Sequence, residues 1–123
     1  MKLLLSLFLT ATVSLSVLAE DSLLGAKIFS QEKPQKYLGK IANKYDRESI
    51  FNKYGPHGSK YSKDCIWNEY GSYGGKYSAH SPFNKYTKTP PMIVSGNKII
   101  GYLTVNPYIR GGITPDDVKR SMK

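Results

Sequence analysis

Lysine stands directly before tyrosine at six places in this chain of 123 residues. The pairs are Lys36-Tyr37, Lys44-Tyr45, Lys53-Tyr54, Lys60-Tyr61, Lys76-Tyr77 and Lys85-Tyr86. A basic side chain beside an aromatic face suits two kinds of anionic ligand. Nucleic acids offer phosphates and bases, whereas acidic envelope glycans and lipid head groups offer charge together with flat apolar surfaces. The pairs therefore predict a surface that binds an anionic polymer.

The predicted ligand-binding side chains come mostly from these pairs. They are Lys44, Lys53, Tyr54, Lys60, Tyr61, Trp67, Tyr70, Lys76, Tyr77, Lys85 and Tyr86. A structural interpretation competes with this one, because tyrosine is the main bulky residue that the region has for packing. In that alternative the tyrosines form an internal stack, and the lysines only solvate its outside.

Three successive segments, residues 45–60, 61–76 and 77–91, can be aligned without a gap. Sixteen residues separate Tyr45, Tyr61 and Tyr77, and the same step separates Asn52, Asn68 and Asn84. Asparagine and glycine favour turns, so each unit is predicted as a tight turn, a very short extended segment and a second turn. Stacking of the units would bury a column formed by Phe51, Trp67 and Phe83.

Catalytic chemistry has little support in the sequence. The two histidines, His57 and His80, stand at repeat positions that other residue types occupy in the sister units. The sequence contains no nucleophile elbow, no zinc-protease helix motif and no glycine-rich phosphate loop. The acids lie among lysines, which lower carboxyl pKa values rather than raise them for general-acid catalysis. We therefore predict a non-enzymatic protein, and keep a small hydrolase or metal-dependent enzyme as an alternative.

The side chains that could ligate a metal are Cys65, His57, His80 and Asp64. They lack the short ligand spacing of metal sites, so we predict no metal and no cofactor. Cys65 is the only cysteine, and no intrachain disulfide can form. It occupies the repeat position of Ser49 and Ser81, which predicts a small buried residue rather than a reactive thiol.

Residues 1–19 have the features of a secretory signal peptide: a positive start, an apolar stretch over 3–18 and a small residue, Ala19, at the cleavage point. The apolar run has 16 residues, fewer than the roughly 20 of a membrane span, so we favour cleavage over a membrane anchor. The protein is thus predicted to be periplasmic or secreted, with no transmembrane segment after cleavage. The formal net charge of +9 favours anionic partners, although solubility alone would also account for it.

The rest of the chain is predicted as a lead-in over 20–36 and one small domain over 37–123. A short strand covers 36–41, a hairpin spans 92–105 around Gly96-Asn97, and Thr114-Pro115 begins a helix over 115–122. The segments 38–45 and 100–108 echo each other, and their strands are expected to form a single three-stranded sheet with 92–94. The predicted fold is α+β, mostly β and loop, with a small antiparallel sheet of about three strands, a Tyr/Asn/Gly 16-residue repeat region and a short C-terminal helix.

The Tyr-Ser-x-x-Ser-Ile-x-Asn-x-Tyr-Gly units and the flanking Leu-Gly-x-Ile-x-Asn-x-Tyr pattern resemble those of a group of small exported bacterial proteins. The resemblance covers about residues 37–109, and members of the group commonly have Asn-Pro-Tyr-Gly in each unit. This chain has Lys53, Glu69 and Lys85 at the proline position, while Pro107 keeps it. The resemblance implies a bacterial, periplasmic or secreted protein, and it implies no activity or functional residue.

Three hypotheses about function follow. The leading one is a non-enzymatic exported protein whose Lys/Tyr-rich repeat surface binds an anionic envelope or extracellular polymer, with nucleic acid less favoured because of the exported location. The second is a protein-binding module, an inhibitor or an accessory subunit of an envelope complex, that uses strand edges and the aromatic column. The third is the enzyme mentioned above. Salt separates the first two, because ionic strength screens lysine-driven binding and leaves an apolar interface intact.

Overall fold

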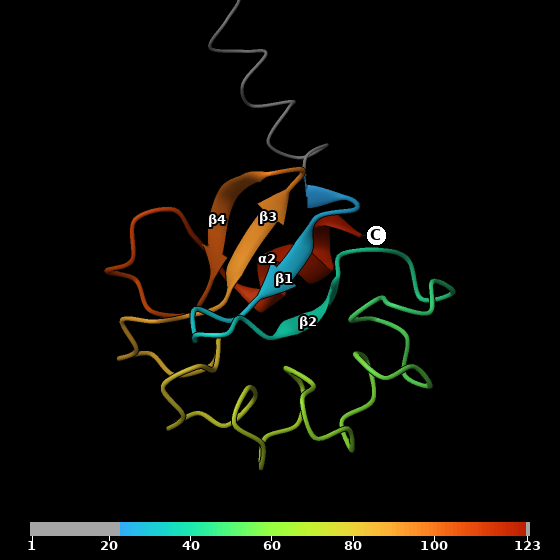
Figure 1. The fold of residues 1–123 in the computed structure, drawn as a ribbon, viewed down its shortest axis with the longest axis horizontal. Coiled ribbons are helices and arrows are strands. Elements are labelled where there is room, and N and C mark those ends of the chain that lie inside the picture. Colours follow the sequence, from blue (N-terminus) through green and yellow to red (C-terminus); the bar gives the residue numbers. More distant parts are fainter. Residues whose placement is uncertain (1–22, 123) are drawn as a thin grey trace, which may run out of the picture.

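A five-stranded sheet and one short helix form the regular structure of residues 23–122, the part of the chain that the computed structural model describes. The elements are β1 (Lys27–Phe29), β2 (Tyr37–Lys40), β3 (Met92–Ser95), β4 (Lys98–Leu103), β5 (Gly112–Ile113) and α2 (Pro115–Ser121). The strands lie in the order β2-β1-β3-β4-β5 (Figure 1). The predicted signal peptide, residues 1–19, lies outside the described residues. Within residues 23–122, no helix is long and apolar enough to span a bilayer.

The sheet has more strands than the three predicted, partly because the segment 20–36 contributes β1. This strand lies between β2 and β3 and pairs antiparallel with both, so β2 joins the sheet through β1. Ile28 at the centre of β1 is fully buried, and removal of its side chain from water favours the pairing. A strand of three residues is too short to show a readable alternation of polar and apolar positions. The prediction of a lead-in outside the domain was therefore wrong.

β3 and β4 form the predicted antiparallel hairpin. Gly96 occupies the first central position of its turn with φ +63°, and no non-glycine residue among 23–122 has a positive φ. A positive φ at the first central position alone is the pattern of a type II′ turn, whose twist matches that of the strands it joins.

The two echoing segments have the same local arrangement, in which a glycine on a strand faces an isoleucine from a segment that returns parallel to that strand. Gly39 on β2 and Gly101 on β4 each face an isoleucine from a returning segment, and a Cβ at either glycine would lie 2.8–2.9 Å from that side chain. The return beside β2 is a single parallel bridge, and the return beside β4 is the parallel strand β5. The sheet is therefore mixed and not wholly antiparallel as predicted.

The predicted C-terminal helix is present as α2. The Thr114 side chain accepts a hydrogen bond from the Asp117 amide at 3.0 Å, and the Asp117 side chain accepts one from the Thr114 amide, which together form a capping box. The contacts of Asp117 with Thr114 and Arg120 lower the pKa of its carboxyl group. Val118 is fully buried and Met122 packs against the core, so the helix docks through the two side chains that the sequence indicated.

Between β2 and β3 the chain forms a series of tight turns along the rim of the sheet, which we call the turn arc (residues 43–89; Figure 1). About every third backbone amide bonds to the carbonyl three residues earlier, beginning with Asp46 to Asn43 and ending with Thr87 to Asn84. At Ser59 and Gly75 the amide reaches back four residues instead. Four steps of three residues and one of four span sixteen residues. No strand lies within residues 43–89, although Ser49 forms a single parallel bridge with Lys40.

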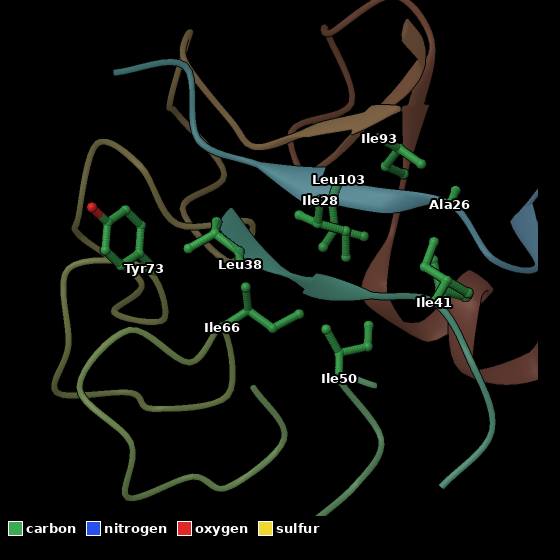
Figure 2. Close-up of a cluster of buried hydrophobic side chains, with 10 residues drawn as sticks. Ala26, Ile28, Leu38, Ile41, Ile50, Ile66, Tyr73, Ile93 and Leu103 are labelled. Atoms are coloured by element: carbon green, nitrogen blue, oxygen red, sulfur yellow. The ribbon is translucent and has the colours of Figure 1, made fainter. Parts of the chain in front are cut away.

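The inner side of the turn arc belongs to the hydrophobic core. Ile50 and Ile66, sixteen residues apart, are buried; Ile66 lies beside Leu38 of β2 (Figure 2), and Ile50 packs against Gly39 of the same strand. Tyr73 joins the same cluster from the second unit. Pro82 is buried at the equivalent position of the third unit, and its carbonyl accepts a hydrogen bond from the Val105 amide at 2.8 Å. The arc is thus attached to the sheet by one buried side chain from each unit.

Candidate functional site

Asparagine side chains position most of the exposed tyrosines. In each Asn-x-Tyr step the side-chain oxygen accepts a hydrogen bond from the tyrosine amide. The bonds measure 2.9–3.0 Å and join Tyr45 to Asn43, Tyr54 to Asn52, Tyr70 to Asn68, Tyr86 to Asn84 and Tyr108 to Asn106. Ser59 acts in the same way for Tyr61 at 3.3 Å. Such a turn fixes the backbone through the preceding side chain and leaves the tyrosine ring unused.

Six of the seven tyrosine rings of the turn arc point into solvent, and Tyr73 alone is buried. Tyr45, Tyr54, Tyr61, Tyr70, Tyr77 and Tyr86 are 75–99% exposed. The alternative prediction, an internal stack of tyrosines, is wrong for these six side chains, because isoleucines and the aromatic column do the packing. Contiguous exposed apolar surface is uncommon on monomeric proteins and often marks a binding site.

Lysine ammonium groups lie over four of these rings. The distances from Nζ to the ring centroid are 5.2–5.5 Å in the pairs Lys44-Tyr45, Lys60-Tyr61, Lys76-Tyr77 and Lys85-Tyr86. At an exposed site such a contact contributes about 0.5–1 kcal/mol, which is enough to favour this orientation of the lysine. Each pair therefore presents a positive charge beside a flat apolar face.

Most acids of the turn arc contact residues of the segment 36–40 and not the lysines that precede the exposed tyrosines. Asp64 lies 3.0 Å from Lys36, Asp46 lies 2.7 Å from Lys40, and Glu48 accepts a hydrogen bond of 2.5 Å from the Tyr37 hydroxyl. Burial raises the pKa of Tyr37, so its hydroxyl stays protonated and remains the donor. None of the ion pairs within residues 23–122 involves a lysine that precedes an exposed tyrosine. These lysines are consequently available to an external anion.

The predicted aromatic column is present on the turn arc. The ring centroids of Phe51 and Trp67 are 6.1 Å apart, and those of Trp67 and Phe83 are 5.8 Å apart. The Trp67 indole nitrogen donates a hydrogen bond to the Ile50 carbonyl at 2.5 Å, which fixes the central ring. Lys119 of α2 lies over the Trp67 ring, 5.0 Å from its centroid. Lys119 could not be predicted as part of the site, because nothing in the local sequence marks a helix residue that reaches a distant loop.

Two hollows open beside the column, and both are lined by Trp67. The first hollow, of about 570 Å³, is lined by Ile50, Phe51, Lys53, Tyr54, Gly58, Ser59, Lys60, Tyr61, Trp67 and Lys119. The second hollow, of about 700 Å³, is lined by Trp67, Glu69, Tyr70, Gly71, Gly74, Gly75, Lys76, Tyr77, Ser78 and Phe83. Each has a pair of column rings and two exposed tyrosines.

The hollows are equivalent places in consecutive units. A shift of sixteen residues carries the Tyr54 and Tyr61 of the first hollow onto the Tyr70 and Tyr77 of the second. It also carries Lys53 onto Glu69, so the charges differ. The first hollow contains three lysines and no acid, whereas the second contains one lysine and one glutamate.

The hollows bring together eight of the eleven predicted ligand residues. Lys53, Tyr54, Lys60 and Tyr61 line the first hollow, Tyr70, Lys76 and Tyr77 line the second, and Trp67 lines both. Lys44, Lys85 and Tyr86 are exposed on the turn arc but line neither hollow. Because the predicted residues recur every sixteen positions, most of them line the two neighbouring hollows.

Cys65 has a structural environment. Its side chain is fully buried, and burial raises the pKa of the thiol, which keeps it protonated and weakly nucleophilic. Its sulfur accepts a hydrogen bond from the Trp67 amide at 3.4 Å, as the Ser49 and Ser81 hydroxyls do for the amides two residues after them. The prediction of a small buried residue at this repeat position is confirmed.

The two histidines lie in separate polar clusters. His57 packs edge-on against Tyr37 with ring centroids 5.0 Å apart, and burial lowers its pKa. His80 Nε2 lies 3.8 Å from the Glu32 carboxylate, which also accepts a hydrogen bond of 2.5 Å from Tyr73. That bond lowers the pKa of Glu32, and burial together with Glu32 raises the pKa of Tyr73 to about 12. Among the described residues, no group of three His, Cys, Asp or Glu side chains is arranged to hold a metal ion.

Comparisons with known proteins add no relative: no protein-family model matches the chain, and neither a curated protein nor a solved structure matches it significantly.

Proposed function

We propose that this chain is an exported, non-enzymatic bacterial protein that binds a linear anionic glycan of the cell envelope or its surroundings along the exposed side of the turn arc. The observation that carries the proposal is the pair of equivalent hollows, which share Trp67 and are bordered by exposed tyrosines and lysines. A polymer with repeated units suits a surface with repeated binding places, because each unit meets similar groups.

The chemistry of the surface favours a glycan over other anionic ligands. Sugar rings present flat C–H faces that pack on aromatic rings, and acidic groups on the sugars find the nearby lysine ammonium groups. Tyrosine and tryptophan offer large contact areas at a small cost in side-chain entropy. The turns fix the backbone at Tyr54 and Tyr70, and lysines lie over the rings of Tyr61 and Tyr77, so binding has less of the site to order.

Retention on an immobilised polyuronate, eluted with a salt gradient, tests this proposal. The protein purified after expression of the full chain should be retained at low salt and released as ionic strength screens its lysines. Replacement of Tyr54 and Tyr70 by Ala should move elution to lower salt. Tyr108→Ala is the matched control, because Tyr108 is 92% exposed and sits in the same Asn-x-Tyr turn but lines neither hollow.

Three outcomes would contradict the proposal. The protein could bind neither the polyuronate nor hyaluronan, in which acidic and neutral sugars alternate, or the double variant could elute with the wild type, which would leave only non-specific charge. A partner captured from an envelope extract that stays bound at high salt would instead favour the protein-binding module. Export has its own readout, since a cleaved signal peptide would leave a mature protein that begins at Glu20.

A further inference from the structure

The two hollows have equivalent aromatic linings but different charges. Both contain column rings and two exposed tyrosines in equivalent positions. In the first hollow, Lys53, Lys60 and Lys119 provide three positive charges without an acid. In the second, Glu69 and Lys76 have opposite charges, so the hollow has no net charge.

This difference determines what each hollow can hold. A carboxylate or sulfate in the first hollow would gain charge-assisted hydrogen bonds. The same group in the second hollow would lie beside the Glu69 carboxylate, and like charges held close together discriminate strongly against a ligand. An uncharged sugar unit meets no such penalty, and both Glu69 and Lys76 can hydrogen-bond its hydroxyl and amide groups.

The two hollows also lie next to each other on the turn arc. Trp67 lines both of them and is the central ring of the column. Two units bound at the same time would therefore lie next to each other on a single polymer chain.

We infer that the turn arc selects a glycan in which an acidic unit adjoins an uncharged one, with the acidic unit in the first hollow and the uncharged unit in the second. The inference rests on the proposed function, since it requires a glycan ligand at this site. It adds the class of glycan: a chain of alternating acidic and neutral sugars rather than a uniform polyuronate.

The fluorescence of Trp67, the only tryptophan, provides a direct readout of binding. The probes are oligosaccharides with equal numbers of rings: hyaluronan, which alternates glucuronate with N-acetylglucosamine, oligogalacturonate, which is acidic throughout, and chitin fragments, which are neutral. A single-stranded oligonucleotide serves as the competing class of polymer. We expect hyaluronan to bind about tenfold more tightly than oligogalacturonate, and the neutral fragments to bind least.

Two pairs of variants separate the local charge pattern from the net charge of the protein. Glu69→Gln and Asn97→Lys each raise the net charge by one, and Lys53→Gln and Lys98→Gln each lower it by one. Asn97 and Lys98 lie in and beside the β3–β4 turn, at the end of the sheet away from the turn arc (Figure 1). Glu69→Gln should abolish the preference for hyaluronan by strengthening oligogalacturonate binding, and Lys53→Gln should weaken hyaluronan binding. The two remote variants should leave the preference unchanged.

The results distinguish failure of this inference from failure of the proposed function. If both acidic oligosaccharides bind equally well and Glu69→Gln behaves like Asn97→Lys, the inference is overturned while glycan binding stands. If neither binds, or if the oligonucleotide binds more tightly than either, both are overturned.

Discussion

The hydrogen bonds within the sheet and those within the turn arc differ in how far apart along the chain their partners lie. Lys27 of β1 pairs with Val94 of β3, far away along the chain, whereas the amides of the arc bond to carbonyls three or four residues earlier. Sheet pairing requires only that the faces of the strands be compatible. A chain of turns requires suitable turn residues at regular steps, and so the arc is rich in Asn, Ser and Gly.

The local hydrogen bonding of the turn arc allows it to carry exposed aromatic side chains. Most of its backbone hydrogen bonds are local, and Ile50, Ile66 and Pro82 are buried against the rest of the molecule. The exposed tyrosines and the lysines beside them contribute no side chain to the core, so these positions can carry lysine and tyrosine facing solvent. In the sheet, by contrast, most apolar side chains are needed for packing. The following predictions test this division of roles.

The largest effect is expected where the arc meets the core. Ile66→Ala should lower the free energy of unfolding by about 2–5 kcal/mol, as much as Ile93→Ala in β3, because both side chains are fully buried. Urea unfolding measures this, and Ile99→Ala, at a position 48% exposed, should change it by about 0.5 kcal/mol or less. An Ile66→Ala protein as stable as Ile99→Ala would mean that the arc does not share the core of the sheet.

A smaller loss is expected from crowding within a turn. A Cβ at Gly74 would lie 2.1 Å from the Asn68 carbonyl oxygen, so Gly74→Ala should cost about 1–3 kcal/mol through a forced shift of the backbone. Thermal unfolding of Gly74→Ala and Gly75→Ala gives the comparison. The Gly75 variant should be milder, since its nearest atoms lie at 3.2 Å and Ser59 occupies the equivalent position of the first unit. The reverse order would show that the two units have different backbones.

Loss of one turn-forming side chain should cost less again. Asn68 accepts a hydrogen bond from the Tyr70 amide at 3.0 Å and donates one to the Ser62 carbonyl at 2.9 Å. Asn68→Ala should therefore destabilise the protein by about 1 kcal/mol, measured by urea unfolding. Tyr70→Ala is the control, because its ring is 92% exposed and its removal should leave stability within about 0.5 kcal/mol. Equal losses for the two variants would contradict the idea that the ring has no structural task.

The smallest effect is a dependence of stability on pH. Burial lowers the pKa of His57 below its usual value of 6.5, so on acidification the unfolded chain takes up a proton before the folded one does. This part of the stability is complete above about pH 6.5 and declines as the pH falls toward the folded pKa. Urea midpoints measured on both sides of this value should show the decline, and His57→Phe should reduce it. An unchanged decline in the variant would assign it to other groups, such as Glu32.

Elements with local signals could be predicted from the sequence. The helix followed from Thr114-Pro115 and the hairpin from Gly96-Asn97, since both depend on residues that touch one another along the chain. β1 and β5 could not be predicted, because strands of three and two residues owe their conformation to their neighbours in the sheet. The parallel return segments likewise depend on packing against Gly39 and Gly101.

The candidate site divides in the same way. The Lys-Tyr pairs, the sixteen-residue step and the positions of asparagine could be read directly, because turn chemistry acts over two or three residues. The outward direction of the tyrosines, the grouping of their neighbours into two hollows and the contact of Lys119 with Trp67 could not. These features arise only when Ile50 and Ile66 are buried against β2, since burial of one side of each unit decides which side chains remain on the other.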